Sequence, residues 1–296
     1  MANIGFVGLG HMGLPMACNL IQAGHRVIGF DLQTSAVAQL AAAGGVAASE
    51  LCEVAKNQDF LITMLQTGQQ VLQVCSPSQG LFKDAPKGCL HIDCSTIDVQ
   101  SSQQVHDLAT NHQLEALDAP VSGGVAGAQA GTLTFMVGGG DESFAKAKPL
   151  LSCMGQKVIH AGPSGSGQAA KICNNMILGI SMIAVAEAFV LAQALGLSAQ
   201  KLFEVVSNAS GQCWTMSKYV PVPGVLDNVP ADHAYEPGFA ALMMLKDLSL
   251  SQQCAKSVQV ETQLGAKAQA LYQDFIDKGF GDLDFSAIIQ QIKHRS

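Results

Sequence analysis

The sequence is poor in charged and in aromatic residues. Only 13% of its 296 residues are Asp, Glu, Lys or Arg, about half the usual share in a soluble domain, and only 5% are aromatic, with a single tryptophan. So few charges, together with abundant glycine and alanine, indicate much buried or inter-subunit surface. The net charge of −7 and the pI near 5.5 argue against non-specific binding to nucleic acid or to an anionic membrane. We therefore expect neither as a partner.

Cysteine patterns typical of a disulfide framework are also missing. The nine cysteines are scattered and odd in number, and they include no Cys-x-x-Cys, which is typical of reduced, buried thiols in a cytosolic compartment. His91 and Asp93 lie between Cys89 and Cys94, but neighbouring side chains of a strand point to opposite faces, so we predict no metal site. The first predicted strand begins at Asn3, which leaves no room for a targeting segment, and we expect a cytoplasmic protein.

One apolar run, residues 176–197, has the length of a membrane span. It contains Glu187 and Gln193, and small residues recur along it. These features favour a helix packed closely inside a soluble protein over a helix in a membrane.

The first 31 residues contain the parts of a dinucleotide-binding unit. A buried strand pattern over 4–8 leads directly into Gly8-Leu-Gly-His-Met-Gly13, a helical pattern follows, and a second strand pattern ends at Asp31. The glycines permit a tight turn that pyrophosphate can approach, and the helix N-terminus offers free N–H groups. Asp31 can accept the ribose hydroxyls of NAD and would repel the 2′-phosphate of NADP. We predict that NAD is the cofactor and that it is bound by Gly8, Leu9, Gly10, His11, Met12, Gly13 and Asp31.

Strand and helix patterns continue to alternate up to residue 163. Further strands are predicted at 59–65, 89–94, 114–118 and 133–137. From about residue 165 the chain reads as helices only: a long apolar one, then 199–207, 239–255, 262–278 and 285–293. The predicted fold is therefore α/β. A Rossmann-type doubly wound domain (1–163) binds NAD, and a long helix joins it to an all-α domain (164–296) for substrate and oligomer contacts.

Three loops are of interest because ligands of open α/β sheets bind beyond the carboxyl ends of strands. They are residues 64–67, Ser95–Thr96 and 120–124. Helix capping explains Ser95 and Thr96 equally well. In the third loop, Ser122 precedes Gly123 and Gly124, whose free N–H groups can form an anion-binding nest, although a simple flexible turn has the same composition.

Two lysines stand out because their neighbours are apolar. Lys171 and Asn175 are four residues apart near the start of the long helix and share a face. We expect Lys171 to be partly buried, which lowers the pKa of a lysine from about 10.4 and makes it a proton donor and acceptor; a surface lysine lying along its helix is the alternative. Lys246 lies in another apolar helix. Asp247 is adjacent and does not share its face, so we expect Lys246 to meet an anionic ligand or another segment.

Four sequence blocks carry a resemblance to a known family: residues 5–13, 118–124 (Asp-Ala-Pro-Val-Ser-Gly-Gly), 165–175 and 246–247. On these blocks the chain resembles the β-hydroxyacid dehydrogenases. Softer matches at 210–214, 221–224 and 238–239 make it similar to those members that act on 3-hydroxyisobutyrate.

The resemblance implies roles for particular residues. Lys171 would be the catalytic acid and base, Asn175 would orient the substrate, and Lys246 would border both cofactor and substrate. The substrate carboxylate would be held by Ser122, Gly123 and Gly124, and the nicotinamide side would be lined by Leu65, Gln66 and Thr96. Family members commonly have proline where this chain has Gln66, so we expect a less rigid loop there.

The expected activity is NAD-dependent oxidation of 3-hydroxyisobutyrate to methylmalonate semialdehyde, a step of valine breakdown. Reduction of tartronate semialdehyde or of another semialdehyde by the same chemistry is the first alternative. A catalytically inactive NAD-binding module is the second. The long apolar helix and the low charge content predict a homodimer or homotetramer.

Overall fold

The computed structural model describes residues 1–76 and 78–295. The chain divides into two compact units, Met1–Lys171 and Ile172 onward. Helix α9 (Ser166–Ala194) begins in the first unit and continues into the second. The unit boundary therefore falls inside this helix, whereas the boundary expected from sequence, after residue 163, falls before it.

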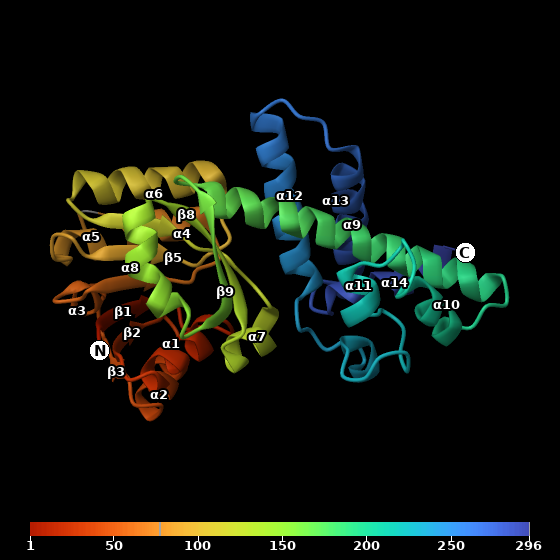
Figure 1. The fold of residues 1–296 in the computed structure, drawn as a ribbon, viewed down its shortest axis with the longest axis horizontal. Coiled ribbons are helices and arrows are strands. Elements are labelled where there is room, and N and C mark those ends of the chain that lie inside the picture. The colour runs from red at the N-terminus through yellow and green to blue at the C-terminus, as the bar shows by residue number, and fades with distance from the viewer. Residues whose placement is uncertain (77, 296) are drawn as a thin grey trace. The chain divides into compact units, whose positions relative to one another are not determined.

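In the part of the chain that the structure describes, the first unit is built on one nine-stranded sheet (Figure 1). The strands are β1 (Asn3–Val7), β2 (Arg26–Phe30), β3 (Val46–Ala47), β4 (Phe60–Thr63), β5 (Leu90–Asp93), β6 (Glu115–Asp118), β7 (Val121–Ser122), β8 (Leu133–Gly139) and β9 (Gly155–Gly162). Their order is β3-β2-β1-β4-β5-β6-β8-β7, with β9 paired to β8. Strands β1 to β6 are parallel, and β8 runs antiparallel to β6 and β7. The predicted doubly wound sheet is confirmed. Its last three strands, β7, β8 and β9, add antiparallel pairings, and a further parallel one between β8 and β9, to the parallel sheet.

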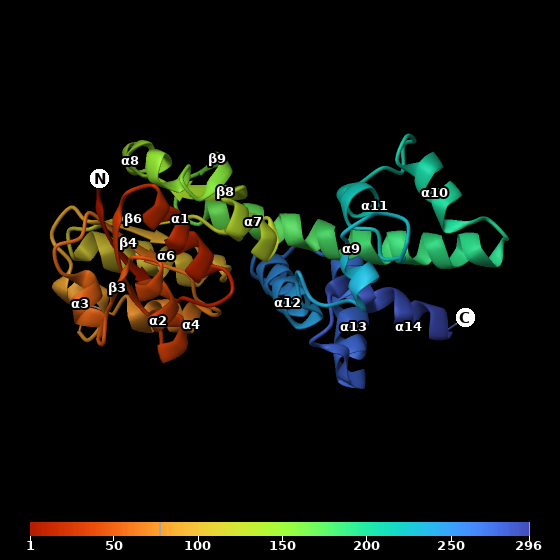
Figure 2. The ribbon, with the colours of Figure 1, turned by 90° about the horizontal axis from the view of Figure 1, so that it is seen from below.

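Helices cover both faces of this sheet (Figures 1 and 2). They are α1 (Gly13–Gln22), α2 (Thr34–Ala42), α3 (Leu51–Ala55), α4 (Gly68–Val74), α5 (Leu81–Asp84), α6 (Val99–Asn111), α7 (Gly124–Ala130) and α8 (Asp141–Leu151). One core contains Met16 of α1 and Leu150 of α8, and a separate core contains Val71 of α4 and Val105 of α6. Strands buried on both faces explain the near-continuous apolar runs of the sequence.

The carboxyl ends of parallel strands meet at one edge of the sheet, and this edge positions the candidate site. The glycine turn follows β1, Asp31 follows β2, residues 64–67 follow β4, and residues 94–98 follow β5. Asp118 is the last residue of β6, in register with Asp93, the last residue of β5.

The second unit is helical. After α9 come α10 (Ala199–Val206), α11 (Trp214–Lys218), a 3-10 turn (Pro230–His233), α12 (Ala241–Ser257), α13 (Gln263–Phe275), a π-helical turn (Ile276–Phe280), a second 3-10 turn (Phe285–Ala287) and α14 (Ile288–Arg295). A β-carbon at Gly179 of α9 would lie 3.1 Å from both Leu248 and Met244 of α12, so the small residue permits close helix packing. The helix expected over 262–278 instead ends in the π-turn, where Gly279 adopts φ 89°.

Among the described residues, α9 is the one helix long and apolar enough to cross a membrane by length and composition alone. Core helices of soluble proteins also meet these criteria. Met182, Ala186 and Phe189 of α9 are buried in the core of the second unit, and 44% of the most apolar stretch is buried. This packing agrees with the expected core helix.

The cysteines are only partly as expected. All nine are free thiols, but only Cys75, Cys89 and Cys94 are buried, and Cys173 is exposed. The expectation of nine buried thiols is therefore wrong. Burial raises the pKa of Cys75 and Cys94 well above 9, so these two side chains behave as small apolar residues.

Candidate active site

The glycines of the turn after β1 have distinct roles. A β-carbon at Gly13 would lie 1.9 Å from Gly8 O, and Gly8 itself adopts φ +94° with Met64 O close behind it. These two positions need glycine for the chain to fold as it does. Gly10 is exposed and its missing β-carbon faces open space, which is where a ligand could approach the bare backbone. The turn therefore fits the pyrophosphate of a dinucleotide.

The neighbours of Gly10 differ in accessibility. His11 is exposed and Met12 is half-buried, whereas the side chain of Leu9 is buried in the core of the first unit. Leu9 therefore has only its backbone to offer a cofactor, and its N–H donates to Asp31 Oδ2 at 2.7 Å.

Asp31 is half-buried and already accepts two backbone hydrogen bonds. Besides Leu9 N, its Oδ1 accepts from Gln33 N at 2.7 Å. An ionised carboxylate has about four lone-pair sites, so both oxygens retain capacity for ribose hydroxyls. The next side chain, Leu32, is 90% exposed and offers no positive charge for a 2′-phosphate.

The loop after β4 is held at both of its ends. Leu65 N donates to Ser95 Oγ at 2.8 Å, and Thr67 caps α4 in a reciprocal capping box with Gln70. Gln66 N donates to Gln70 Oε1 at 3.1 Å. A proline at position 66 would lack this N–H, so the departure from the family pattern adds a hydrogen bond here, which opposes the expected loosening.

Ser95 and Thr96 do not cap the following helix. The cap of α6 is Asp98, whose carboxylate accepts from Ser101 N at 2.7 Å, so the capping explanation is wrong. Ser95 is fully buried and Thr96 is half-buried. Ser95 Oγ donates to Asp93 Oδ1 at 2.6 Å.

Asp93 and its neighbours form a buried polar cluster at the end of β5. Its Oδ1 also accepts from Thr63 Oγ1 at 2.8 Å, and Thr63 Oγ1 lies 3.0 Å from His91 Nε2. Burial raises the pKa of Asp93 to about 6, and its hydrogen bonds to Ser95 and Thr63 oppose that rise. Burial lowers the pKa of His91 to about 3, so this imidazole is neutral near pH 7.

Asp118 anchors the start of α9. Its Oδ1 accepts from Gly165 N at 2.8 Å and its Oδ2 from Gln168 N at 2.9 Å. A negative charge at a helix N-terminus is favourable. A β-carbon at Gly167 would lie 2.8 Å from Asp118 Oδ2 and 2.3 Å from Met136 O, so glycine is needed for this close approach. His106 Nε2 lies 3.3 Å from Asp118 Oδ1.

The glycine loop at residues 120–124 follows β6 and includes the short strand β7. Ser122 ends β7, opposite Thr134 of β8. Gly123 adopts φ +136° and Gly124 φ +63°, both unfavourable for residues with a side chain. Gly123 is exposed and the other two are half-buried, so the loop is accessible to a small ligand.

Lys171 is only 7% exposed. This agrees with the expected partial burial and excludes a lysine lying along the protein surface. It follows Gln168 by three residues, so the two side chains are neighbours on one face of α9.

The predicted residues of the second unit form their own group. Asn175 Nδ2 donates to Asp247 Oδ2, and both residues are buried. Lys246 Nζ lies 4.0 Å from Asp247 Oδ1, which corrects the expectation that adjacent positions keep these side chains apart. The lysine side chain is long enough to reach the neighbouring carboxylate. An argument from helix faces considers only where a side chain starts and therefore misses this contact.

Comparison with known proteins identifies the family. Residues 3–162 match the profile described as the NAD binding domain of 6-phosphogluconate dehydrogenase. Residues 165–292 match the profile described as NAD-binding of NADP-dependent 3-hydroxyisobutyrate dehydrogenase. The rat protein named 3-hydroxyisobutyrate dehydrogenase, mitochondrial, is 43% identical over 290 residues, which are 98% of this chain and 87% of the relative. The chain belongs to the 3-hydroxyisobutyrate dehydrogenase family.

Two further relatives bear on the substrate. A Pseudomonas aeruginosa protein named NAD-dependent L-serine dehydrogenase is 45% identical over 288 residues, 97% of each chain. The solved structure of Mycobacterium tuberculosis 3-hydroxyisobutyrate dehydrogenase with L-serine has a TM-score of 0.94 and 45% identity, and the match covers 99% of each chain. The protein is thus an NAD-dependent 3-hydroxyacid dehydrogenase, and NAD is its cofactor, which its glycine turn fits.

Sequence reasoning missed three buried side chains at this edge: Asp93, Asp118 and Gln168. The two aspartates have a shared signal, since each is the final residue of a strand in the parallel part of the sheet. Gln168 lies inside a block quoted for its glycines and lysine, and nothing in its spacing distinguishes it.

Proposed function

We propose that the protein oxidises 3-hydroxyisobutyrate to methylmalonate semialdehyde, with Lys171 as the general acid and base. The observation that carries this proposal is a lysine 7% exposed on a helix whose first turn is anchored to the carboxyl edge of the dinucleotide-binding sheet. Bound NAD supplies the hydride acceptor. Cytoplasmic valine breakdown is the setting we propose, and free thiols throughout agree with a reducing compartment.

In the proposed reaction the substrate alcohol loses a hydride from carbon and a proton from oxygen, and a carbonyl forms. Neutral Lys171 accepts the proton, and its protonated form returns it in the reverse direction. The backbone of Ser122, Gly123 and Gly124 binds the substrate carboxylate, so that the alcohol carbon is held in one orientation. We assign Asn175 to orienting the substrate and Lys246 to contacting substrate and cofactor, while Leu65, Gln66 and Thr96 contact the nicotinamide side.

L-Serine is the second candidate substrate, because a 45% identical relative is named for its oxidation. Both molecules are 3-hydroxy carboxylic acids, and they differ in the group on the second carbon, methyl or ammonium. NADH formation with 3-hydroxyisobutyrate, L-serine and glycerate at matched concentrations separates the candidates. If kcat/KM is highest with 3-hydroxyisobutyrate, the proposal is supported. If kcat/KM is higher with L-serine, L-serine is the substrate and the proposal is wrong.

The role of Lys171 is tested with Lys171→Ala. We expect turnover to fall about 10²–10⁴-fold while NADH binding, measured by NADH fluorescence, stays within about threefold of wild type. Normal turnover in this variant would remove Lys171 from the mechanism.

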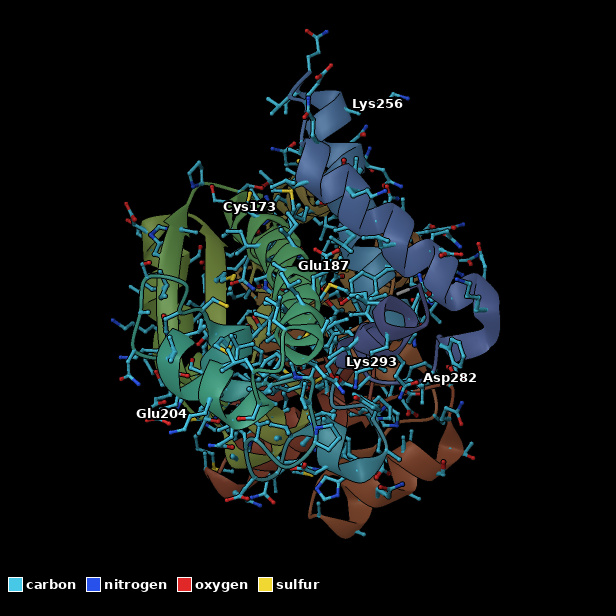
Figure 3. All side chains as sticks on the ribbon, turned by 90° about the vertical axis from the view of Figure 1, so that its right-hand side faces the viewer. Cys173, Glu187, Glu204, Lys256, Asp282 and Lys293 are labelled. Atoms are coloured by element: carbon cyan, nitrogen blue, oxygen red, sulfur yellow. The ribbon has the colours of Figure 1, made fainter. Side chains whose placement is uncertain are left out.

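We also propose a homodimer formed through α9. Exposed residues recur along this helix at spacings of three, four or seven, which place them on one face: Cys173, Ile177, Ala184, Glu187, Leu191 and Ala194. Ile177 is 64% and Leu191 61% exposed, and Figure 3 labels Cys173 and Glu187. A largely apolar stripe of this kind is typical of a helix covered by another subunit.

Light scattering after gel filtration tests the dimer. Leu191→Glu places a charge in the stripe and should convert the protein to a monomer. Leu264→Glu, at an exposed leucine of α13 outside the stripe, is the matched control and should leave the mass unchanged. A dimer that persists in Leu191→Glu would exclude this interface.

A further inference from the structure

One buried side chain, Gln168, links the helix of Lys171 to the loop after β5. Gln168 lies in the first turn of α9 and is fully buried. Its Nε2 donates to Ser95 O at 2.7 Å, and its Oε1 accepts from Ile97 N at 3.1 Å. The side-chain amide of Gln168 therefore hydrogen-bonds to the backbone on both sides of Thr96.

The hydrogen bonds continue from Ser95 to the loop after β4. Ser95 Oγ accepts from Leu65 N at 2.8 Å and donates to Asp93 Oδ1 at 2.6 Å. A hydroxyl that uses its proton and a lone pair in this way is fixed in orientation. The bond to the carboxylate is charge-assisted whenever Asp93 is ionised, which makes it stronger than a bond between neutral groups. One buried network thus connects the backbone of both loops with the start of α9.

Gln168 is well placed to set the position of Lys171. A helix is stiff over a single turn, so bonds that fix residue 168 also fix the backbone of residue 171. Asp118 holds the same turn through Gly165 N and Gln168 N. Displacing a reacting group by about 1 Å can cost about 10²-fold in rate, so small movements of this turn matter.

We propose that Gln168 is a positioning residue that sets Lys171 against the loops at residues 65 and 96. The proposal rests on the function assigned to Lys171 above. Gln168 acts through Lys171 and through the backbone around Thr96, and it takes no part in proton transfer. The hydrogen bonds of this buried network restrain both loops, and losing the amide loosens both loops together.

The test is Gln168→Met, which keeps the side-chain size and removes both hydrogen bonds. We expect kcat with 3-hydroxyisobutyrate to fall about 10–100-fold, with KM and NADH affinity within about threefold of wild type. In the protein without cofactor, hydrogen exchange at the Ile97 amide should become faster, because its acceptor is gone. Unchanged kcat in a folded Gln168→Met would overturn the proposal.

Gln58→Met is the matched control. Gln58 is a buried glutamine of the same unit that donates to Lys56 O at 2.7 Å, and it lies just before β4, at the amino ends of the strands. Its replacement removes a buried amide hydrogen bond far from the carboxyl edge. Equal losses of kcat in both variants would show a general effect of destabilisation and would overturn the proposal.

A double mutant separates positioning from mere support of the fold. In a Lys171→Ala background, adding Gln168→Met should lower the residual rate by a much smaller factor than it lowers the wild-type rate, because one of the two groups being positioned is absent. A further loss equal to that in wild type would overturn the proposal. If Lys171→Ala alone turns over normally, the proposed function fails, and that result is distinct from a failure of Gln168.

Gln168→Glu keeps the proposal testable if the methionine variant does not fold. A protonated glutamate has the shape of glutamine and can both donate to Ser95 O and accept from Ile97 N, whereas the ionised form repels Ser95 O. Burial raises the pKa of such a carboxyl. Turnover relative to wild type should therefore fall as pH rises, and a ratio independent of pH would overturn the proposal.

Discussion

Replacing Asp31 by asparagine should weaken NAD binding and relax the discrimination against NADP. Asparagine keeps one oxygen acceptor, so the hydrogen bond from Leu9 N, 2.7 Å in wild type, can persist and hold the glycine turn. The variant loses the negative charge and one charged acceptor. A hydrogen bond to a charged group contributes roughly 1.5–3 kcal/mol, which corresponds to about a 10–100-fold weaker affinity for NAD.

The loss of charge has a second effect on NADP. A carboxylate about 5 Å from a phosphate charge is repelled by about 3 kcal/mol at an effective dielectric constant near 20. Asp31 is half exposed, so we take about half of this value. The two effects together, about 3–4.5 kcal/mol, should shift the ratio of kcat/KM for NAD over NADP by about two to three decades.

The assay is steady-state kinetics with each cofactor at saturating hydroxy acid, combined with thermal unfolding to confirm the fold. Asp59→Asn is the matched control. Asp59 also accepts a backbone N–H, from Asn3 at 2.8 Å, but it precedes β4 and so lies at the opposite edge of the sheet from Asp31. A cofactor ratio that stays constant in a folded Asp31→Asn, or that changes equally in Asp59→Asn, would refute the reasoning.

Two further predictions concern the first unit. Gly10→Ala should unfold at the wild-type temperature yet bind NADH more weakly, because its β-carbon enters open space on the side of the turn where we expect the cofactor. Gly13→Ala should lower the unfolding temperature, because its β-carbon would meet Gly8 O at 1.9 Å. Equal unfolding temperatures of the two variants would contradict this prediction. The pKa of His91 is lowered from 6.5 to about 3 in the folded protein, so the unfolded chain binds a proton that the folded chain does not below pH 6.5, and stability is lost as pH falls. Going from pH 7 to pH 5, wild type should therefore lose about 2 kcal/mol more of its free energy of unfolding than His91→Gln, measured by urea titration at both pH values, and equal losses would exclude His91 as the cause.

The sequence predicts the parallel half of the sheet well because buried parallel strands read as apolar runs bounded by turns. It misses β9 because every residue of this strand after Gly155 is exposed or half-buried and because it contains Gln156 and Lys157, a polar stretch that the apolar-run criterion overlooks. Strands β3 and β7 are only two residues long and carry no periodicity. These short strands exist because of their partners, β2 and β8, and a local pattern contains no information about partners.

The residues of the candidate site also divide into those that the sequence predicts and those that it does not. The glycine turn, Asp31 and the Gly123–Gly124 loop are visible in the sequence because each requires a particular residue type at a particular backbone position. The hydrogen bond from Asn175 to Asp247 joins residues 72 positions apart, and no spacing rule connects them. The sequence also does not predict that Lys246 Nζ approaches Asp247 Oδ1, because this contact depends on the side-chain conformation.

The buried aspartates Asp93 and Asp118, at the carboxyl ends of β5 and β6, belong to the candidate site and also hold its backbone in place. A carboxylate is costly to bury unless its oxygens are hydrogen-bonded, and Asp118 meets that need with backbone N–H groups of the helix that carries Lys171. The same bonds fix the start of α9, and Asp93 holds the loop around Ser95 through one oxygen, Oδ1, which accepts from Ser95 N and Ser95 Oγ. Asp118→Leu would leave Gly165 N and Gln168 N without their acceptors, so we expect this variant to lose both turnover, measured as kcat, and stability, measured by thermal unfolding.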